Sequence, residues 1–508
     1  MSEAIKRVVV VGGDPCAPAV AAFIAHSLRG TDAKITLLDD LSSHGGAAST
    51  LPVSTDFYKQ LGFKEQSLVA GIGATFKLGT EHSGWLRNDH RFMQSYGEHG
   101  APIRLLPFHQ YYFKQRLVDP SLNFDDYSLA SVAALGGRFA FSSPPLRYGL
   151  QIHLQRFAHA MLSYATAAGV EHIASLAKSA TLQPESGFID FVTLNNGTVV
   201  KGDLFIDCTS ENGLLIGAAL EVGYLDWSEF LPCNRCVRIS TNEVFDPTPM
   251  TRVVAKQDGW SRRMQMLDRA EFEFFYNSGI SSDADVETQL AKDVGASTSE
   301  QADYRSVSTG RRESFWHGNC IAIGRSAGNF EPLEVSSTST AHNAVMRLMK
   351  WWPHADCDPA IAREYNRLTA LEYDSNRDFV GLFYAASDRD DSDFWAHCQS
   401  LKQSELLQSR LSLFRSRGRL SWNAEESFSR NKWTSALVGL NLSPRDYDPL
   451  VDVADPKLVD QYLTELRQEI VETVDRMPTH VDFLRDVHAA SGNAANAADT
   501  TSSPAPSR

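Results

Sequence analysis

The feature that most constrains the fold is a short apolar run near the N-terminus, Arg7-Val-Val-Val-Val-Gly-Gly13. Four consecutive valines are typical of a buried parallel strand, and the two glycines then turn the chain. The amphipathic stretch that follows, to Leu28, predicts a helix, and a second strand is predicted over 34–38. This order predicts the opening unit of a dinucleotide-binding domain, in which Asp39, about 20 residues after the turn, would bind a ribose hydroxyl.

The turn departs from the Gly-x-Gly-x-x-Gly fingerprint of such domains. Gly12 keeps the first glycine, whereas Asp14 and Ala17 stand in place of the second and third. Asp14-Pro15 is itself a helix-start signal, an N-cap carboxylate followed by proline. A carboxylate ~4 Å from a phosphate would repel it by roughly 4 kcal/mol at an effective dielectric of ~20. Two interpretations stay open: a nucleotide site weakened at its phosphate end, or a helix capped by its own side chain with no nucleotide below it.

Composition excludes several classes of function. The 508 residues are 43% hydrophobic and 22% charged, which is typical of a globular protein. A net charge of −14 argues against nucleic acid or an anionic membrane as a partner. Because the chain shows neither a membrane-spanning stretch nor a signal peptide, we expect a cytoplasmic protein. The seven cysteines are scattered and odd in number, and the single pair Cys233-x-x-Cys236 predicts no metal site.

Strands and helices alternate along the chain, which predicts an α/β fold. Strands over 177–207 surround an Asn195-Asn-Gly197 hairpin turn and end at Asp207, which returns the chain to the first sheet. A nucleotide domain split by insertions is therefore more economical than a row of separate domains. From Pro359 onward the chain is predicted to be mainly helical, with a tail rich in Ala, Ser, Asn, Thr and Pro.

One charged residue lies in a predicted strand and another in a predicted loop. Lys77 lies in a strand predicted over 73–80, and Glu334 lies in the loop between a strand predicted over 316–324 and the next helix. By itself, the lysine is typical of a solvated strand edge, and the glutamate of a helix-start carboxylate. A loop rich in glycine and serine, 40–52, indicates a functional or mobile segment.

Taken together, six stretches resemble the flavin-dependent tryptophan halogenase family between about residues 6 and 487. The resemblance implies a Rossmann-like, flavin monooxygenase-like FAD-binding domain with inserted β segments and a mostly helical second part. It divides the chain into a split domain (1–355, with substrate-side insertions at about 85–150 and 225–310), a helical subdomain (356–488) and a disordered tail (489–508). The matching stretches are Gly73-Ala-Thr-Phe-Lys-Leu-Gly79 with Gly84-Trp85, Asp203-Leu-Phe-Ile-Asp-Cys208, Gly213-Leu-Leu-Ile216, Leu231-Pro-Cys233, Gly318-Asn-Cys320 and Glu331-Pro-Leu-Glu334.

The resemblance also implies a chemistry. In that family a separate flavin reductase supplies FADH2, and chloride or bromide becomes hypohalous acid, which meets a lysine and a glutamate beside a small aromatic substrate. Lys77 and Glu334 match this catalytic pair. An ammonium group polarises the electrophilic halogen, and a carboxylate positions it and assists proton loss from the ring. Trp260, Phe108 and His109 fall on the substrate side, and a homodimer is one open alternative for the oligomeric state.

Most departures from the family pattern concern flavin and halide. The flavin loop reads Gly45-Gly-Ala-Ala-Ser-Thr-Leu-Pro52, without the family's second glycine and its glutamate, and Trp260-Ser-Arg-Arg-Met-Gln265 keeps only the first tryptophan of its motif. Ser336 and Ser337 match positions whose backbone amides hold the halide. The implied cofactor-binding residues are Gly12, Gly13, Asp14, Ala17, Asp39, Gly45, Gly46, Ala47, Ser49, Thr50, Asp207 and Gly324.

Two functions of different classes therefore stay open. One is an FADH2-dependent halogenase of an indole- or phenol-type small molecule, which the Lys77 and Glu334 match favours. The other is a flavin-free or weakly flavin-binding paralogue that binds an aromatic ligand or a partner protein, which Asp14 and Gln265 favour. A flavin hydroxylase is a third alternative, since it would need the same cofactor.

Overall fold

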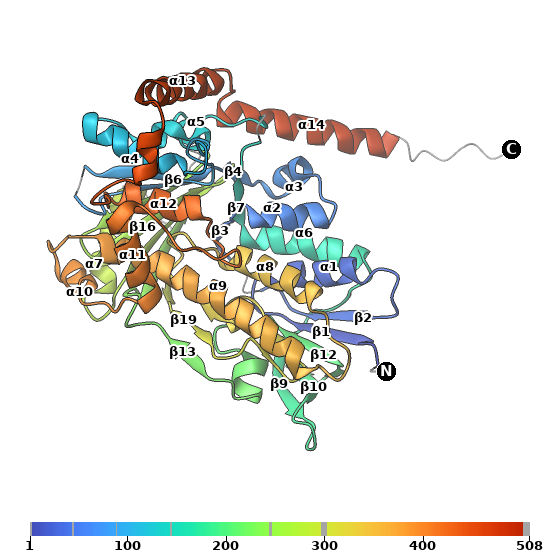
Figure 1. Cartoon of the computed structure of the whole chain (residues 1–508). Coiled ribbons are helices and arrows are strands. Elements are labelled where there is room, and N and C mark those ends of the chain that lie inside the picture. The colour runs from blue at the N-terminus through green and yellow to red at the C-terminus, as the bar shows by residue number, and fades with distance from the viewer. Residues whose placement is uncertain are drawn as a thin grey trace.

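The computed structural model shows two sheets side by side, with helices packed around both (Figure 1). For residues 491–500 it describes the backbone only. None of the helices formed by the described residues is both long and apolar enough to cross a membrane. The described residues are 3–42, 45–87, 89–142, 145–242, 246–295 and 302–500.

The valine run forms the central strand of a six-stranded sheet, as predicted. This strand, β1, pairs in parallel with β2 on one side and β12 on the other, and its four valines are buried. Four apolar residues in a row after Arg7 fit a strand that is covered on both faces. The sheet order is β20-β21-β12-β1-β2-β8. Its strands are β1 (Arg7–Val11), β2 (Lys34–Leu38), β8 (Glu171–Ile173), β12 (Leu204–Asp207), β20 (Trp316–His317) and β21 (Cys320–Ala322).

Different layers cover the two faces of this sheet. Helices lie on one face, and the three-stranded sheet β9–β11 lies on the other (Figure 1). A further small sheet, in the order β3-β7-β4, lies beside the helices. The helices are α1 (Ala17–Ser27), α2 (Val53–Gln60), α3 (Glu65–Ile72), α6 (Leu154–Ala167) and α8 (Ser337–Lys350). The strands are β3 (Ala47–Ser49), β4 (Thr75–Lys77), β7 (Gly149–His153), β9 (Ala177–Leu182), β10 (Ile189–Leu194) and β11 (Val199–Lys201).

The second sheet has seven strands in the order β18-β14-β17-β16-β15-β5-β6. Strands β16 and β17 form an antiparallel pair in this sheet. Most of the sheet is antiparallel, whereas β15 and β5 are parallel. Its strands are β5 (Gly79–Ser83), β6 (Arg91–Ser95), β14 (Arg235–Thr241), β15 (Thr251–Lys256), β16 (Gly259–Gln265), β17 (Ala270–Tyr276) and β18 (Asp303–Ser306).

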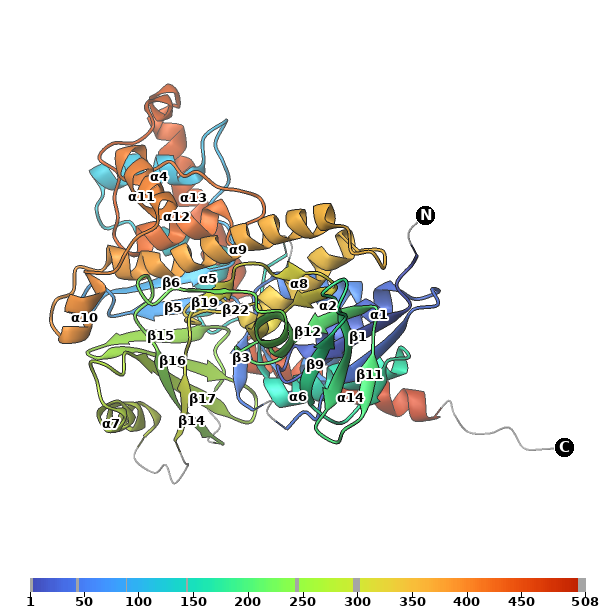
Figure 2. The same cartoon turned by 90° about the horizontal axis from the view of Figure 1, so that it is seen from below.

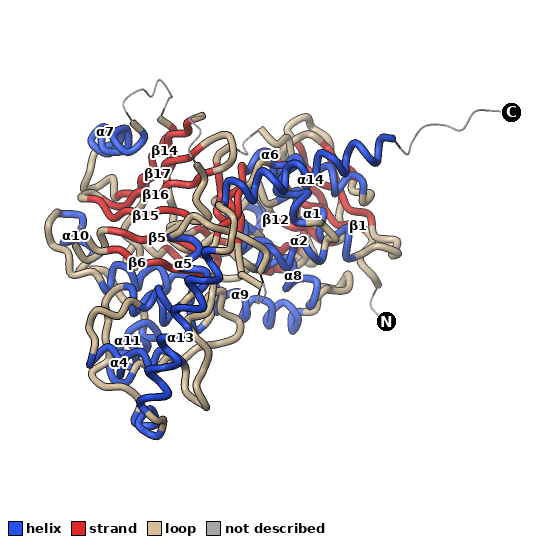
Figure 3. The backbone as a smooth tube through the Cα atoms, turned by 90° about the horizontal axis from the view of Figure 1, so that it is seen from above, coloured by secondary structure: helices blue, strands red, loops and turns tan. Residues whose placement is uncertain are grey.

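The long helix α9 lies across both sheets, and a group of helices extends beyond the β5–β6 edge (Figure 2). Seen from above, α4, α11 and α13 gather in that group, so helix α4 of the 85–150 segment lies with the C-terminal helices, while β6 of the same segment belongs to the seven-stranded sheet (Figure 3). The remaining helices are α4 (Phe108–Val118), α5 (Leu129–Leu135), α7 (Asp283–Val294), α9 (Pro359–Ala386), α10 (Asp393–Cys398), α11 (Glu405–Arg417), α12 (Arg430–Gly439), α13 (Pro456–Asp475) and α14 (His480–Thr500). Short elements are β13 (Tyr224–Asp226), β19 (Gly310–Arg312), β22 (Gly328–Asn329), η1 (Phe124–Tyr127), η2 (Leu214–Ala219), η3 (Gly324–Ser326) and η4 (Pro449–Val453).

The strand predicted over 73–80 is in fact two strands that belong to different sheets. β4 ends at Lys77, the N–H of Leu78 donates to the carbonyl of Pro249, and β5 begins at Gly79. A Cβ on Gly79 would lie 2.4 Å from the carbonyl oxygen of Gln94, so the close approach of β6 requires glycine there. The break places Lys77 at the junction of the small sheet β3-β7-β4 and the seven-stranded sheet.

Three other elements differ from the sequence prediction. The strand predicted over 316–324 is a hairpin, β20–β21, because the chain turns at Gly318, which has a φ of 56°. Helix α1 begins at Ala17 instead of just after Asp14, because the chain first turns at Pro15 and Cys16, where the N–H of Ala17 donates to the carbonyl of Asp14. Residues 489–500 of the expected tail continue helix α14, while 501–508 lie outside the described residues.

Candidate functional site

A cleft of about 810 Å³ lies between the two sheets, within the size range of small-molecule sites. The turn after β1, strand β3 and the loop before α8 form part of its wall, and strands β14, β16 and β17 contribute the opposite part. Of the residues predicted to bind cofactor or halide, those that line the cleft are Gly12, Gly13, Asp14, Gly45, Ala47, Ser49, Ser336 and Ser337.

The backbone donors in the turn before α1 already have acceptors inside the protein. The N–H of Gly13 donates to Asp39 Oδ2 (3.3 Å), and that of Asp14 to the carbonyl of Cys208 (2.9 Å). The N–H groups of Cys16 and Ala17 both donate to Asp14, and Pro15 has none. A helix N-terminus binds an anion through such donors, so this turn offers the anion little.

The charge of Asp14 is paired. Arg325 Nε lies 2.7 Å from Asp14 Oδ2, and both side chains line the cleft. Burial opposes ionisation of Asp14, but the Arg325 guanidinium and the Cys16 N–H hold the pKa of this carboxyl below its usual value. The sequence predicted that Asp14 would repel a phosphate. Arg325 offsets this repulsion, and its contact with Asp14 could not be predicted from the sequence.

The start of α8 does offer donors to an anion. Ser336 caps the helix, its Oγ accepting from the N–H of Ser339 at 3.3 Å. The N–H groups of Ser337 and Thr338 have no acceptor among the residues that the structure describes, and both residues line the cleft. Free N–H groups at the positive end of the helix dipole favour a small anion here.

Lys77 lies directly behind the cleft wall. Its Nζ is 2.6 Å from Ser49 Oγ, and Ser49 itself lines the cleft. The amine also lies over the ring of Tyr96, 5.5 Å from its centroid. Burial lowers the pKa of Lys77 to about 7, an effect that Glu334 opposes and that Lys432 adds to. A substantial fraction of this amine is therefore neutral near neutral pH.

Glu334 makes two buried contacts, neither of them with Lys77. Its Oε1 lies 2.7 Å from His82 Nε2 on β5, and its Oε2 lies 3.0 Å from Lys432 Nζ on α12. Burial opposes ionisation, but Lys432, His82 and Lys77 together lower the pKa of Glu334 to about 2. The carboxylate is therefore ionised throughout the physiological range. Burial lowers the pKa of His82, so its ring is neutral and donates to Glu334.

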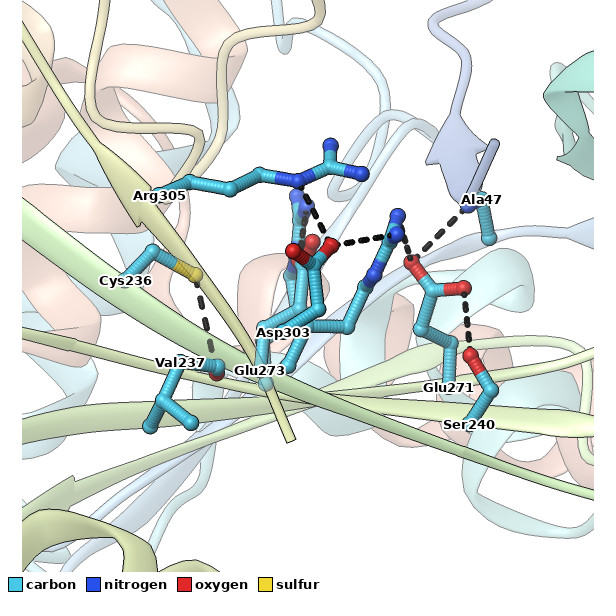
Figure 4. A network of polar contacts seen from close by, with 10 residues as sticks. Ala47, Cys236, Val237, Ser240, Glu271, Glu273, Asp303 and Arg305 are labelled. Atoms are coloured by element: carbon cyan, nitrogen blue, oxygen red, sulfur yellow. Dashed lines mark hydrogen bonds and ion pairs between the residues drawn. The ribbon is translucent and has the colours of Figure 1, made fainter. Parts of the chain in front are cut away.

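A row of charges on the second sheet faces the cleft. Arg262 on β16 pairs with Glu273 on β17, with Nε 2.8 Å from Oε2, and both line the cleft. Beside them, Ala47 on β3 donates its N–H to Glu271 Oε1 at 2.8 Å, and Ser240 also contacts Glu271 (Figure 4). These contacts tie the glycine-rich loop to the second sheet.

Several predicted cofactor residues do not line the cleft. Asp39 is fully buried and accepts from the N–H groups of Gly13 and Leu41. A Cβ on Gly12 would lie 2.3 Å from Asp39 Oδ2, so the first glycine makes room for this carboxylate. Asp207 is likewise buried and accepts from backbone N–H groups at the start of η2. The other predicted residues outside the cleft lining are Ala17, Gly46, Thr50 and Gly324.

The predicted substrate-side residues are buried away from the cleft lining. Trp260 Nε1 donates to the hydroxyl of Tyr384 (2.9 Å), which in turn donates to Glu331. Burial raises the pKa of Glu331 to about 7. His109 Nε2 contacts the carbonyl of Gly418, and Phe108 packs in the helical part. The expected substrate role of Trp260, Phe108 and His109 stays a prediction.

All seven cysteines are buried and free. Within the described ranges, no group of His, Cys, Asp and Glu side chains could hold a metal ion.

Three residues that sequence reasoning missed are central to the site: Lys432, His82 and Arg325. Lys432 lies 98 positions after Glu334 in sequence, and His82 and Arg325 belong to no recognised motif. Only the tertiary contact of α12 and β5 with the loop before α8 reveals the first two.

Comparison with known proteins matches most of the chain to one protein family. The sequence model of the tryptophan halogenase family matches residues 7–456. Tryptophan 6-halogenase ThaL from Streptomyces albogriseolus is 26% identical over 97% of this chain and 100% of its own length. Tryptophan 7-halogenase RebH from Lentzea aerocolonigenes is 25% identical over 96% of this chain and 100% of its own length.

Two solved structures extend the comparison. BrvH, a flavin-dependent halogenase from Brevundimonas sp. BAL3, superposes with a TM-score of 0.90 at 32% identity, covering 95% of this chain and 99% of BrvH. Xcc4156, a flavin-dependent halogenase from Xanthomonas campestris, superposes with a TM-score of 0.91 at 30% identity, covering 95% and 98%.

Proposed function

Because this chain belongs to the tryptophan halogenase family, whose members use FADH2 and halide, we propose that it halogenates a small aromatic molecule of the indole or phenol type. Lys77 and Glu334 are the proposed catalytic pair. The observation that carries the proposal is the hydrogen bond of 2.6 Å between Lys77 Nζ and Ser49 Oγ, because Ser49 also lines the cleft. Ser49 thus contacts both the cleft, in which the electrophilic halogen would form, and the buried amine.

The residues around the cleft fit FAD. Gly45, Ala47 and Ser49 form one wall for the flavin, and Arg325 can bind a phosphate in place of the α1 backbone donors. The start of α8, with the N–H groups of Ser337 and Thr338, suits chloride or bromide. Bound FADH2, with oxygen and halide, would supply hypohalous acid in this cleft.

The roles of the protein's own groups follow from their protonation states. With its pKa near 7, the Lys77 amine can either hold halogen as the neutral base or polarise it as ammonium. Glu334 is ionised, and each of its oxygens has a lone pair left beyond its contacts with His82 and Lys432. In this proposal Glu334 receives the proton that the aromatic ring loses.

Substitution of the pair tests the proposal. Lys77→Ala should abolish halogenated product while FAD binding is kept, because the amine acts only on the electrophile. Glu334→Gln should lower kcat with little change in KM, because its interaction is used mainly in the transition state. The assay supplies a flavin reductase, NADH, FAD, chloride or bromide, and a panel of indoles and phenols.

Two further measurements control this experiment. Lys402→Ala removes a surface lysine that pairs with Glu229 and should leave product formation unchanged. Thermal melts of all variants detect loss of stability. Product that survives Lys77→Ala would refute the assigned role of Lys77.

The turn before α1 favours a second candidate function. Since its backbone donors are occupied internally, a flavin-free paralogue that binds an aromatic ligand or a partner protein is the alternative. In that case Lys77 and Glu334 are structural charges. Absence of product with every substrate, together with lowered melting temperatures of both variants, would favour this function.

A further inference from the structure

The buried charges around Glu334 include a second lysine that the catalytic proposal does not use. Lys432 Nζ lies 3.0 Å from Glu334 Oε2 and donates to the carbonyl of Gln94 at 2.8 Å. Its side chain is buried, on the first turn of α12. Both lysines lie over the same ring, that of Tyr96, with centroid distances of 5.5 Å for Lys77 and 5.0 Å for Lys432. One carboxylate therefore stands beside two buried amines.

The contacts of the two amines differ. Lys432 contacts a carboxylate and a carbonyl, which are acceptors only and suit an ammonium group. Lys77 contacts the hydroxyl of Ser49, which can accept from an ammonium or donate to a neutral amine. Among the described residues no carboxylate is in ion-pair contact with Lys77. The geometry thus assigns the negative charge of Glu334 to Lys432.

Resting on the halogenase function proposed above, we propose that Lys432 is a positioning residue that takes Glu334 as its own counter-ion and so leaves the Lys77 amine neutral and able to accept halogen. An ammonium has no lone pair, whereas a neutral amine does. The nitrogen lone pair attacks the halogen of hypohalous acid, the N–halogen bond forms and the halogen–oxygen bond breaks. The oxygen leaves as hydroxide and takes the extra proton from nitrogen, so that the products are a haloamine and water.

The charged groups that face Lys77 either raise or lower its pKa. Lys432 on α12 and Arg262 on β16 lower its pKa, and Glu334 raises it. His82 on β5 is neutral, and Ser49 and Tyr96 carry no charge at neutral pH. Burial is the largest cause of the low pKa of Lys77. Removal of Lys432 would delete a repelling cation and leave Glu334 free to attract a proton to Lys77, so both changes raise its pKa.

A titration of Lys77 itself tests this inference. Protein labelled with carbon-13 at the lysine Cε is followed by NMR against pH, and Lys77→Arg assigns the signal. Lys432→Met should move the Lys77 midpoint upward by roughly 1 to 3 pH units, whereas Lys432→Arg should leave it in place because the charge is kept. An unchanged midpoint in Lys432→Met would overturn the inference. The measurement needs no flavin, halide or substrate, so its outcome is independent of whether the proposed function is correct.

Two further variants guard against a loss of folding. The double change Lys432→Met with Glu334→Gln removes both charges, keeps the core neutral overall and should return the midpoint toward that of the wild type. Arg347→Met breaks an equally buried pair, with Glu372, between α8 and α9, and should lower stability without moving the Lys77 midpoint. A shift as large in Arg347→Met as in Lys432→Met would also overturn the inference.

The pH profile of halogenation gives a second readout. Lys432→Met should lose activity near pH 7 and recover it at higher pH, where the Lys77 amine becomes neutral again. A merely structural role of Lys432 would lower activity by the same factor at every pH, and that result would contradict the proposal.

Discussion

At the scale of single residues, the site is decided by which charges meet. From the sequence alone, Asp14 is expected to repel a phosphate. In the structure, Arg325 Nε lies 2.7 Å from Asp14 Oδ2, and both residues line the cleft. The carboxylate therefore has two effects: it neutralises an arginine that could bind phosphate, and it occupies the N–H of Cys16. On the proposed function, we expect flavin affinity to depend on the Asp14–Arg325 pair more than on the missing glycine.

Substitutions of Asp14 separate these two effects. Asp14→Asn removes the charge and releases Arg325, while an oxygen still accepts from Cys16; Asp14→Gly also frees that N–H group. FAD should bind more tightly in the order wild type, Asp14→Asn, Asp14→Gly. One charge-assisted hydrogen bond is worth about 1.5 to 3 kcal/mol, or roughly tenfold to a hundredfold in Kd. Fluorescence titration with oxidised and reduced FAD measures the series.

The matched control is Glu211→Gln. Glu211 lines the same cleft but contacts Asn329, 3.0 Å away, so its loss should change FAD affinity less than that of Asp14. Equal affinities of wild type and Asp14→Asn would show that the FAD phosphates do not lie near Asp14.

At the scale of elements, the two helices that start at the cleft differ in the backbone N–H groups that they offer to an anion. The N–H groups in the turn before α1 donate to acceptors inside the protein. At the start of α8, the N–H groups of Ser337 and Thr338 have no acceptor among the described residues. Ser336 has extended backbone angles (φ −125°, ψ 114°), and Ser337 is the first helical residue. Proline is tolerated both at such a first position and after such a residue.

Ser337→Pro therefore removes one N–H group while the helix start is kept. If α8 holds the halide, KM for chloride or bromide should rise by roughly tenfold to a hundredfold, because one hydrogen bond to a charge is lost. The comparison is Ser336→Ala, which keeps every N–H but loses the cap and should reduce stability by about 1 kcal/mol. A normal halide KM in Ser337→Pro would place the halide elsewhere.

At the scale of the whole molecule, the junction between the small sheet β3-β7-β4 and the seven-stranded sheet buries charges that a single sheet would leave in water. Lys77 ends β4 in the small sheet, and His82 on β5 and Lys432 on α12 both contact Glu334. Burial of these groups opposes folding unless each is neutral or paired. Lys77 is the group without a carboxylate in contact, so its protonation should be visible in the stability of the whole protein.

Stability against pH measures this directly. The pKa of Lys77 is about 7 in the folded protein and near 10.5 when unfolded, so the unfolded chain binds more protons between these values. Lys77 therefore makes the free energy of unfolding increase as pH rises from 7 to 10, by at most about 1.4 kcal/mol per pH unit. Lys77→Met lacks this gain, so wild type should become more stable relative to the variant over that range. A constant difference in urea or thermal unfolding would contradict the low pKa.

The sequence by itself determined the architecture. Four buried valines, the Gly12 turn and the strand over 34–38 carry local and periodic signals that do not depend on distant partners. The family motifs likewise located Lys77 and Glu334, because the residues around each are contiguous in the chain.

The tertiary structure alone decided how the site is charged. Lys432 reaches Glu334 from 98 residues away, Arg325 reaches Asp14 from 311, and the break at Leu78 sends β4 and β5 to different sheets. No local sequence pattern predicts these contacts, because the partner of a side chain and its exposure to water are set only when distant segments of the chain pack together. The protonation state of a side chain depends on its contact partner and on its exposure to water. The protonation state of the Lys77 amine could therefore be inferred only from the folded structure.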